Sequence, residues 1–226
     1  MPPVQSLSSS AVSLLLSDAR LPVGGHTQSG GLEPALLAGL SPEGIVGYCR
    51  TRLATVVRTE AATAVVARNV ALEHGDLGLV HAHWAARTPS AAQRETSAEL
   101  GRGLLRLARR LWLTGADLAA LAALPSPARP LVLGAVAART GLDAHHLAQV
   151  VAYDDVQTVV AAGLKLAPGD PVVATGWVWE QLGEIDRLAT EVAGARTPGD
   201  IPSLAAPQIE EWAQAHAHTT RRLFRA

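Results

Sequence analysis

Residues 130–166 read PLVLGAVAARTGLDAHHLAQVVAYDDVQTVVAAGLKL and show the pattern that recurs along most of the chain. Proline suits the first turn of a helix, so we expect a helix to start at Pro130. Gly141 follows the last residue of the apolar pattern, as glycines at helix C-termini do. Asp143 supplies a capping side chain for a second helix that runs to about Leu166. The stretch predicts two helices joined by a tight turn, without the alternation that is typical of strands.

The same helical spacing extends outward on both sides. Ser41 and Pro42 predict another helix start, followed by apolar residues on one helical face: Ile45, Cys49, Leu53, Val56 and Val57. Asp76 and Asp170 are further expected caps. We therefore predict an all-α fold, a compact bundle of about nine or ten helices that forms a single domain over residues 1–226. Residues 1 to about 9 are expected to be flexible, and residues from about 220 to 226 form a separate C-terminal tail.

Two glycines interrupt a helix that Thr88 and Pro89 are expected to open. Gly101 and Gly103 lie well inside its apolar pattern. Glycine costs roughly 1 kcal/mol inside a helix, so the two residues indicate the close approach of another backbone. Apolar stripes on nearly every predicted helix also indicate more apolar surface than a monomer of this size buries. We therefore expect a homodimer.

The composition excludes several classes of protein. Hydrophobic residues make up 48% of the 226 residues and charged residues 17%, which is typical of a folded chain and not of a disordered one. The net charge of −1 lacks the basic excess of a nucleic-acid-binding protein. No apolar run approaches the roughly 18 residues of a membrane span. Cys49 is the only cysteine, so an internal disulfide or a multi-thiolate zinc site is excluded. No secretory signal is recognisable, and we expect a cytoplasmic protein.

Two motifs invite a chemical interpretation that their details do not support. Residues 21–33, LPVGGHTQSGGLE, are rich in glycine but lack the Gly-Lys-Ser/Thr ending and the preceding strand of a phosphate-binding loop. A tight turn between helices is the simpler interpretation. Asp154 and Asp155 resemble the aspartates that hold magnesium in helical prenyl-chain enzymes, but Thr158 and Val159 stand where a third carboxylate would be needed. We expect the two aspartates to be paired structurally.

The eight histidines do not predict a metal site. Pairs such as His145 and His146 are adjacent, so they point in different directions on a helix, whereas a helical metal pair needs a spacing of three or four. His26 is either a polar turn residue or a transient metal contact that meets its counterpart across a dimer axis. The sequence shows no catalytic constellation, and we expect a protein that is not an enzyme and binds no cofactor of its own.

Four blocks of sequence resemble the UreF family of urease accessory proteins. Residues 21–33 resemble its N-terminal signature, L-P-x-G-G-F-S-x-S-x-G-L-E. Residues 94–107 are similar to its R-E-T segment with G-x-x-L-L, and residues 160–168 to its A-A-x-V-K-L-x-P block. Residues 216–226 are similar to its H-E-T-x-x-x-R-L-F-R-S ending. The blocks follow the family's order over nearly the whole chain, and we refer to them as the four sequence blocks.

The resemblance implies an all-α dimer that binds the accessory protein UreD, also called UreH, and the GTPase UreG. The assembled complex would insert nickel into apo-urease with GTP hydrolysis by UreG, handling nickel only transiently. The residues to which the resemblance assigns partner binding are Leu21, Pro22, Gly24, Gly25, His26, Arg94, Glu95, Lys165, Arg222, Leu223, Phe224 and Arg225.

Some positions depart from the family pattern and bear on which contacts carry over. His26 replaces an aromatic residue, Gly30 a glutamine and Ala217 an acid. Phe224, the only phenylalanine, is the third residue from the chain end and is expected to become ordered when the tail meets UreD. Lys165 is expected to face a partner and not merely to stabilise a helix end.

Two other functions compete with this interpretation. A helical ligand-sensing transcriptional regulator would need a basic recognition helix, yet the predicted first helix, residues 10–18, contains no lysine or arginine. A helical lyase or prenyl-transfer enzyme would need convergent carboxylates, and only Asp154 and Asp155 are available. The proteins that the purified chain retains from a lysate would separate these alternatives.

Overall fold

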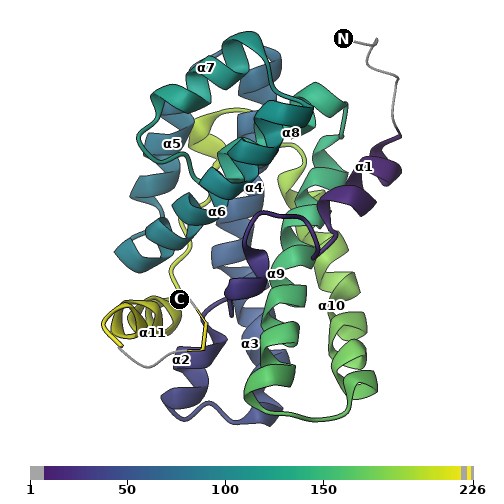
Figure 1. Cartoon of the computed structure of the whole chain (residues 1–226), viewed down its shortest axis with the longest axis vertical. Helices are drawn as coiled ribbons and strands as arrows, with labels where there is room; N and C mark the ends of the chain where they lie inside the picture. The colour runs from purple at the N-terminus through teal and green to yellow at the C-terminus, as the bar shows by residue number, and fades with distance from the viewer. Residues whose placement is uncertain (1–7, 220–222, 225–226) are drawn as a thin grey trace.

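The computed structural model describes residues 8–219 and 223–224 (Figure 1). Within them lie eleven α-helices and three short 3₁₀ helices, and no β-strand. The α-helices are α1 (Ser9–Leu16), α2 (Leu32–Leu37), α3 (Ile45–Ala54), α4 (Val56–Leu72), α5 (Leu77–Ala86), α6 (Ala91–Leu111), α7 (Gly115–Ala123), α8 (Arg129–Thr140), α9 (Ala144–Leu166), α10 (Pro171–Val192) and α11 (Pro207–Ala217). The 3₁₀ helices are η1 (Gly25–Thr27), η2 (Pro42–Gly44) and η3 (Pro198–Asp200). The predicted all-α class is confirmed.

Helix starts follow the predicted caps closely. The carboxylates of Asp76, Asp143 and Asp170 accept hydrogen bonds from the backbone N–H groups of Gly78, His146 and Val172 at 2.7, 2.9 and 2.8 Å. Each bond satisfies one of the four N–H groups that a helix leaves without an internal partner at its start. Local sequence is therefore enough to position α5, α9 and α10.

One predicted boundary was wrong. The apolar face drawn from Ile45 to Val57 belongs to two helices, because Thr55 adopts φ −127° and ψ −94° and breaks the chain between α3 and α4. Helix α1 begins at Ser9, and the hydroxyl of Ser8 caps it by accepting from the Ala11 N–H at 3.2 Å. Residues 1–7 lie outside the described residues.

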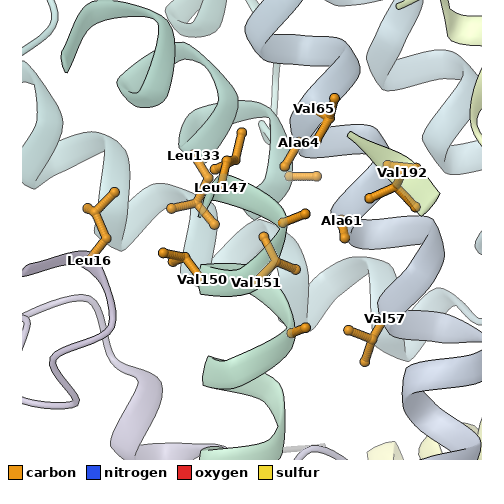
Figure 2. Close-up of a cluster of buried hydrophobic side chains, with 14 of the residues drawn as sticks. Leu16, Val57, Ala61, Ala64, Val65, Leu133, Leu147, Val150, Val151 and Val192 are labelled. Carbon is orange, nitrogen blue, oxygen red and sulfur yellow. The ribbon is translucent and has the colours of Figure 1, made fainter. Parts of the chain in front are cut away.

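Helix α4 lies at the centre of the bundle and packs against α8, α9 and α10 (Figure 1). Its small side chains, such as Ala61 and Ala64, face the apolar residues of α9, including Val150 and Val151 (Figure 2). Small residues let the helix axes approach, and Gly134 in α8 shows how closely: a β-carbon there would lie 2.5 Å from the Ala64 carbonyl oxygen. The alanine richness of the chain therefore serves tight packing around α4.

The remaining helices pack around α4 and its neighbours. Helices α9 and α10 run side by side, and the segment between α1 and α2 crosses α9 (Figure 1). Helix α11 returns to pack on α2 and α6, so the chain's C-terminal part lies beside its N-terminal signature. Within the described range, no helix combines the length and the hydropathy that crossing a membrane requires.

Candidate functional site

The glycine-rich segment forms a turn that only glycine accommodates easily. Gly24, Gly30 and Gly31 have φ angles of +90°, +60° and +78°, which L-residues with side chains rarely adopt. The hydroxyl of Thr27 donates to the Gly24 carbonyl oxygen at 2.8 Å and closes η1. The turn positions His26 at the surface, where its side chain is exposed. The predicted tight turn between helices is confirmed.

Gly101 and Gly103 bring other parts of the same chain against α6. A β-carbon on Gly101 would lie 2.0 Å from the Pro127 carbonyl oxygen, and one on Gly103 would lie 2.5 Å from the Val23 carbonyl oxygen. The predicted backbone approach is confirmed. Its use as support for a dimer was wrong, because both contacts lie within one chain.

The end of the chain is bound to the N-terminal signature by one acid. Glu33, whose side chain is 7% exposed, accepts hydrogen bonds from the backbone N–H groups of Leu223 and Phe224, both at 2.7 Å. His216 lies beside this pair, with Nε2 3.4 Å from the Glu33 carboxylate and 3.3 Å from the Phe224 carbonyl oxygen. A carboxylate that receives two N–H bonds in a dry environment forms a strong anchor.

Phe224 belongs to the core of its own chain. Its exposure is 5%, and it joins the central hydrophobic cluster. The expectation that this side chain waits for a partner was therefore wrong, because Glu33 and the core already hold it. Leu223 differs, since it is 65% exposed. Arg222 and Arg225, also assigned to the tail, lie outside the described residues.

Lys165 stands over this anchored segment. It lies in the last turn of α9, and its ammonium nitrogen is 5.2 Å from the centre of the Phe224 ring. A cation over an aromatic face is attracted by the ring, by about 0.5–1 kcal/mol at exposed sites. The ammonium group nevertheless belongs to an exposed residue and can meet another molecule.

The four sequence blocks meet around one cavity of about 410 Å³, which we call the junction cavity. Its walls include His26 from the first block, Leu104 from the second, Lys165 from the third and Phe224 from the fourth. The side-chain oxygen of Gln28 on this wall is buried and, within the described part of the chain, accepts no hydrogen bond. The blocks that are far apart in sequence thus build a single surface feature.

Arg94 and Glu95 lie elsewhere. Arg94 donates to the carbonyl oxygens of Thr88 and Pro89 at 2.5 and 2.8 Å and so fixes the start of α6. Both side chains border a separate hollow of about 440 Å³. The structure brings Leu21, Gly25, His26, Lys165 and Phe224 together at the junction cavity but does not bring this pair there.

The paired aspartates take the structural role predicted for them. Asp155 forms a two-pronged ion pair with Arg52 at 2.6 and 2.9 Å, and Asp154 pairs with Arg129 at 2.9 Å. Burial alone would lower the pKa of Arg52, but the adjacent Asp155 carboxylate outweighs it and raises that pKa. The ion pairs tie α9 to α3 and α8 and are not arranged around a metal.

Glu60 is the polar residue that the sequence did not single out. It borders a cavity of about 120 Å³ behind the two ion pairs, and the indole N–H of Trp84 donates to its carboxylate at 2.5 Å. Burial raises the pKa of Glu60 to about 7, although the Trp84 bond opposes the rise. No motif marks this residue, because its environment is made by α5, α8 and α9 together.

Within the described residues, the cysteine and histidine side chains form neither a reactive thiol site nor a metal-binding group. Burial raises the pKa of Cys49 to about 12, so its thiol stays protonated and unreactive near neutral pH. No group of three or more His, Cys, Asp or Glu side chains within residues 8–219 and 223–224 could hold a metal ion.

Comparisons with known proteins bear on the family of this chain. The UreF family model matches residues 41–183. The urease accessory protein UreF of Mycobacterium marinum is 34% identical over 218 residues, covering 95% of this chain and 97% of that protein. The UreF proteins of Mycobacterium bovis (strain BCG / Pasteur 1173P2) and Mycobacterium tuberculosis (strain H37Rv) are each 36% identical over 225 residues, covering 96% of this chain and 99% of theirs.

The relatives carry the name of an accessory protein and not of an enzyme or a transcriptional regulator, in agreement with the interpretation favoured by the four sequence blocks. The chain belongs to the UreF family of urease accessory proteins and has a role in urease maturation.

Proposed function

We propose that this chain acts in the cytoplasm as a homodimeric assembly factor that, with UreD (UreH) and the GTPase UreG, inserts nickel into apo-urease. Family membership carries the proposal. The convergence of the four sequence blocks on the junction cavity supports it, because the exposed residues His26 and Lys165 of two of these blocks lie on the wall of the same cavity.

Within this complex, the exposed residues of the junction cavity serve as the docking face for UreG. Lys165 and His26 are both exposed on its wall and present cationic or polar groups without filling the cavity. The tail binds UreD through Leu223. The side chain of Leu223 is 65% exposed, while its neighbour Phe224 is buried in the core. GTP binds to UreG, and this chain holds no cofactor of its own.

Nickel passes along the complex without being stored on this chain. Imidazole is a suitable nickel ligand, and His26 is exposed, but two copies across a dimer axis would supply only two ligands and hold nickel weakly. Purified protein dialysed against a chelator is therefore expected to retain no stoichiometric nickel. His26→Ala should keep its melting temperature, and a loss of urease activation in that variant would support a transfer role.

The proposal is tested by complementation. A urease-positive bacterium that lacks its own UreD, UreF and UreG genes would receive this chain together with the UreD and UreG genes of the same source. Urease activity and nickel per urease should be restored with this chain, and not when UreG is omitted. Soluble expression without restored activity, together with no co-purification of UreD or UreG, would contradict the proposal.

A further inference from the structure

Helix α6 exposes a row of cationic side chains along its outer face. We call this the arginine row, and it consists of Arg102, Arg106, Arg109 and Arg110. Its members recur at intervals of four, three and one, so they share one helical face and extend over about 12 Å of the helix. The opposite face of α6, which includes Leu104 and Ala108, is buried against the bundle. The row is therefore a charged surface on a helix that is otherwise part of the core.

The arginine row is not neutralised by its own chain. Its last three members form no hydrogen bond or ion pair with residues 8–219 and 223–224, and the first donates only to the hydroxyl of Ser126, at 3.5 Å. Arginines elsewhere, such as Arg52, Arg129 and Arg187, are paired with carboxylates. The row thus gathers four cations in one place and leaves their guanidinium groups available to another molecule.

The end of the helix accounts for only part of this charge. Cations in the last turn of a helix are stabilised by the partial negative charge there, and Arg109 and Arg110 lie in the last turn of α6. Arg102 and Arg106 lie before it, and like charges four residues apart destabilise a helix. These two arginines therefore have a cost within the chain that an external anion would remove.

The backbone beneath the row is already fixed in the single chain. Gly101 and Gly103 bring the backbone of Pro127 and Val23 against α6, and α8 and α11 pack on either side of it (Figure 1). A guanidinium group can bind a carboxylate through two parallel hydrogen bonds, and a rigid helix presents several such groups at fixed intervals. A partner that binds the row would therefore order arginine side chains but not the backbone of α6.

The charges around the row favour an acidic protein segment over a nucleic acid. Glu95 is exposed on the same face, about two turns before Arg102, and would repel phosphates that continued along the helix. The net charge of −1 also lacks the general basic excess of proteins that bind nucleic acids. A segment with carboxylates over about 12 Å would neutralise the row, and a basic residue next to them would meet Glu95.

A second copy of α6 is a poor match for the row. If two antiparallel copies placed Glu95 of one beside Arg110 of the other, Arg102 of each copy would lie beside Arg102 of the other. These like charges would repel each other at the centre of the contact. The occupant that fits the row is therefore a different protein.

We propose that the arginine row of α6 is a docking surface for an acidic segment of another protein, whose carboxylates pair with the guanidinium groups. None of the four side chains lines the junction cavity, so this surface is separate from the one assigned to UreG above. The inference rests on the proposed function only for the choice of candidate proteins, which are UreD, UreG and apo-urease.

The full-length chain alone provides the first test, because the chemistry of the row does not depend on which protein binds it. Binding of a fluorescent polyglutamate peptide is measured by anisotropy at low salt. Arg102→Gln combined with Arg106→Gln should weaken this binding by about 10-fold, and Arg139→Gln, at an exposed arginine in the last turn of α8, should leave it unchanged. Equal loss of binding in the two variants would overturn the proposal, as would tighter binding of a polyuridine RNA than of polyglutamate.

The melting temperature separates docking from a structural role. Arg102 and Arg106 repel each other and lie before the last turn, so replacing both with glutamine should not lower the melting temperature. A lower melting temperature together with unchanged polyglutamate binding would make the row a structural feature of α6 and would refute the docking surface.

The scarcity of lysine allows the partner to be identified by cross-linking. Lys165 is the only lysine in the chain, and a carbodiimide joins lysine amines, but not guanidinium groups, to carboxylates. Arg106→Lys keeps the positive charge and introduces an amine into the row, and Arg139→Lys introduces one at the control position on α8. Each full-length variant is co-expressed with UreD, UreG and apo-urease, and the cross-linked peptides are identified by mass spectrometry.

The amine introduced by Arg106→Lys should be joined to neighbouring aspartates or glutamates of one of these three proteins, and the amine introduced by Arg139→Lys should not. Cross-links from Arg106→Lys only within the chain or to a second copy of it would overturn the proposal, as would the same cross-links from both variants. Urease activity restored by a chain whose row forms no such cross-links would leave the proposed function standing. Polyglutamate binding at the row without any restored activity would do the reverse, so the two failures are distinguishable.

Discussion

Gly103 in α6 lies so close to Val23 that a β-carbon at this position would stand 2.5 Å from the Val23 carbonyl oxygen. The contact holds the glycine-rich segment against α6, and Val23 and Leu104 line the junction cavity beside it. Since the opposing atoms are backbone atoms, neither side can yield by rotating a side chain. The first and second sequence blocks therefore depend on each other for their positions.

Gly103→Ala is expected to destabilise the protein by about 1–3 kcal/mol, the usual range for overpacking a tight interior. The gain in helix propensity, roughly 1 kcal/mol, is too small to reverse the sign. Urea unfolding followed by circular dichroism measures the change. Gly47→Ala is the control, because Gly47 lies in α3 with no atom within 4 Å of an added β-carbon and should become slightly more stable. Equal effects of the two substitutions would contradict the packing explanation.

Glu33→Ala is expected to release the end of the chain while the helical bundle stays folded. The substitution leaves two backbone N–H groups without their acceptor and should cost about 1–3 kcal/mol. Amide hydrogen exchange at Leu223 and Phe224 should accelerate much more than exchange in α4. Glu33→Gln, which keeps one acceptor oxygen, should show a smaller effect, and Glu211→Ala on the exposed side of α11 should show none. Unchanged protection of the two amides would show that Glu33 is not the anchor.

Lys165→Ala is expected to weaken recruitment of UreG while the melting temperature changes little. The cation over the Phe224 ring contributes only about 0.5–1 kcal/mol at such an exposed site. Arg139→Ala is the matched control, because Arg139 is also an exposed cation in the last turn of a helix. Co-purification of UreG with each variant provides the measurement. Full recruitment by Lys165→Ala would leave Lys165 as a helix-end charge that only packs over the tail.

The sequence was sufficient where structure is decided locally. The caps at Asp143 and Asp170 were predicted correctly because a capping side chain and its N–H partner lie two or three residues apart. Asp154 and Asp155 were rightly expected to be structural because a metal site needs a third carboxylate nearby.

The sequence was insufficient where distant segments meet. Phe224 resembles an isolated aromatic residue near a chain end, and its burial depends on the core and on the bond from its backbone N–H to Glu33, 191 positions away. Gly101 predicts the close approach of another backbone. The sequence around it does not show whether that backbone belongs to the same chain or to a second copy. The junction cavity likewise depends on four blocks whose meeting point the fold alone determines.

Glu60 gives the chain a dependence of stability on pH that one substitution should remove. The pKa of this carboxyl rises from 4.5 to about 7 in the folded protein because the group is buried. The folded state therefore holds the Glu60 proton more tightly than the unfolded chain does. For this group, stability is highest below pH 4.5, falls as the pH rises to about 7, and is constant above that.

Glu60→Gln should be more stable than the wild type at pH 8, on the order of 3 kcal/mol at 1.36 kcal/mol for each pH unit of the pKa difference. The amide oxygen can still accept from the Trp84 indole, so the two proteins should have similar stability near pH 4. Urea unfolding at a series of pH values between 4 and 8 measures the difference. Glu211→Gln should follow the wild-type curve throughout, since Glu211 is exposed. A difference between Glu60→Gln and the wild type that stays constant over this range would show that Glu60 is ionised in the folded protein, with Arg129 and Arg52 compensating for its burial.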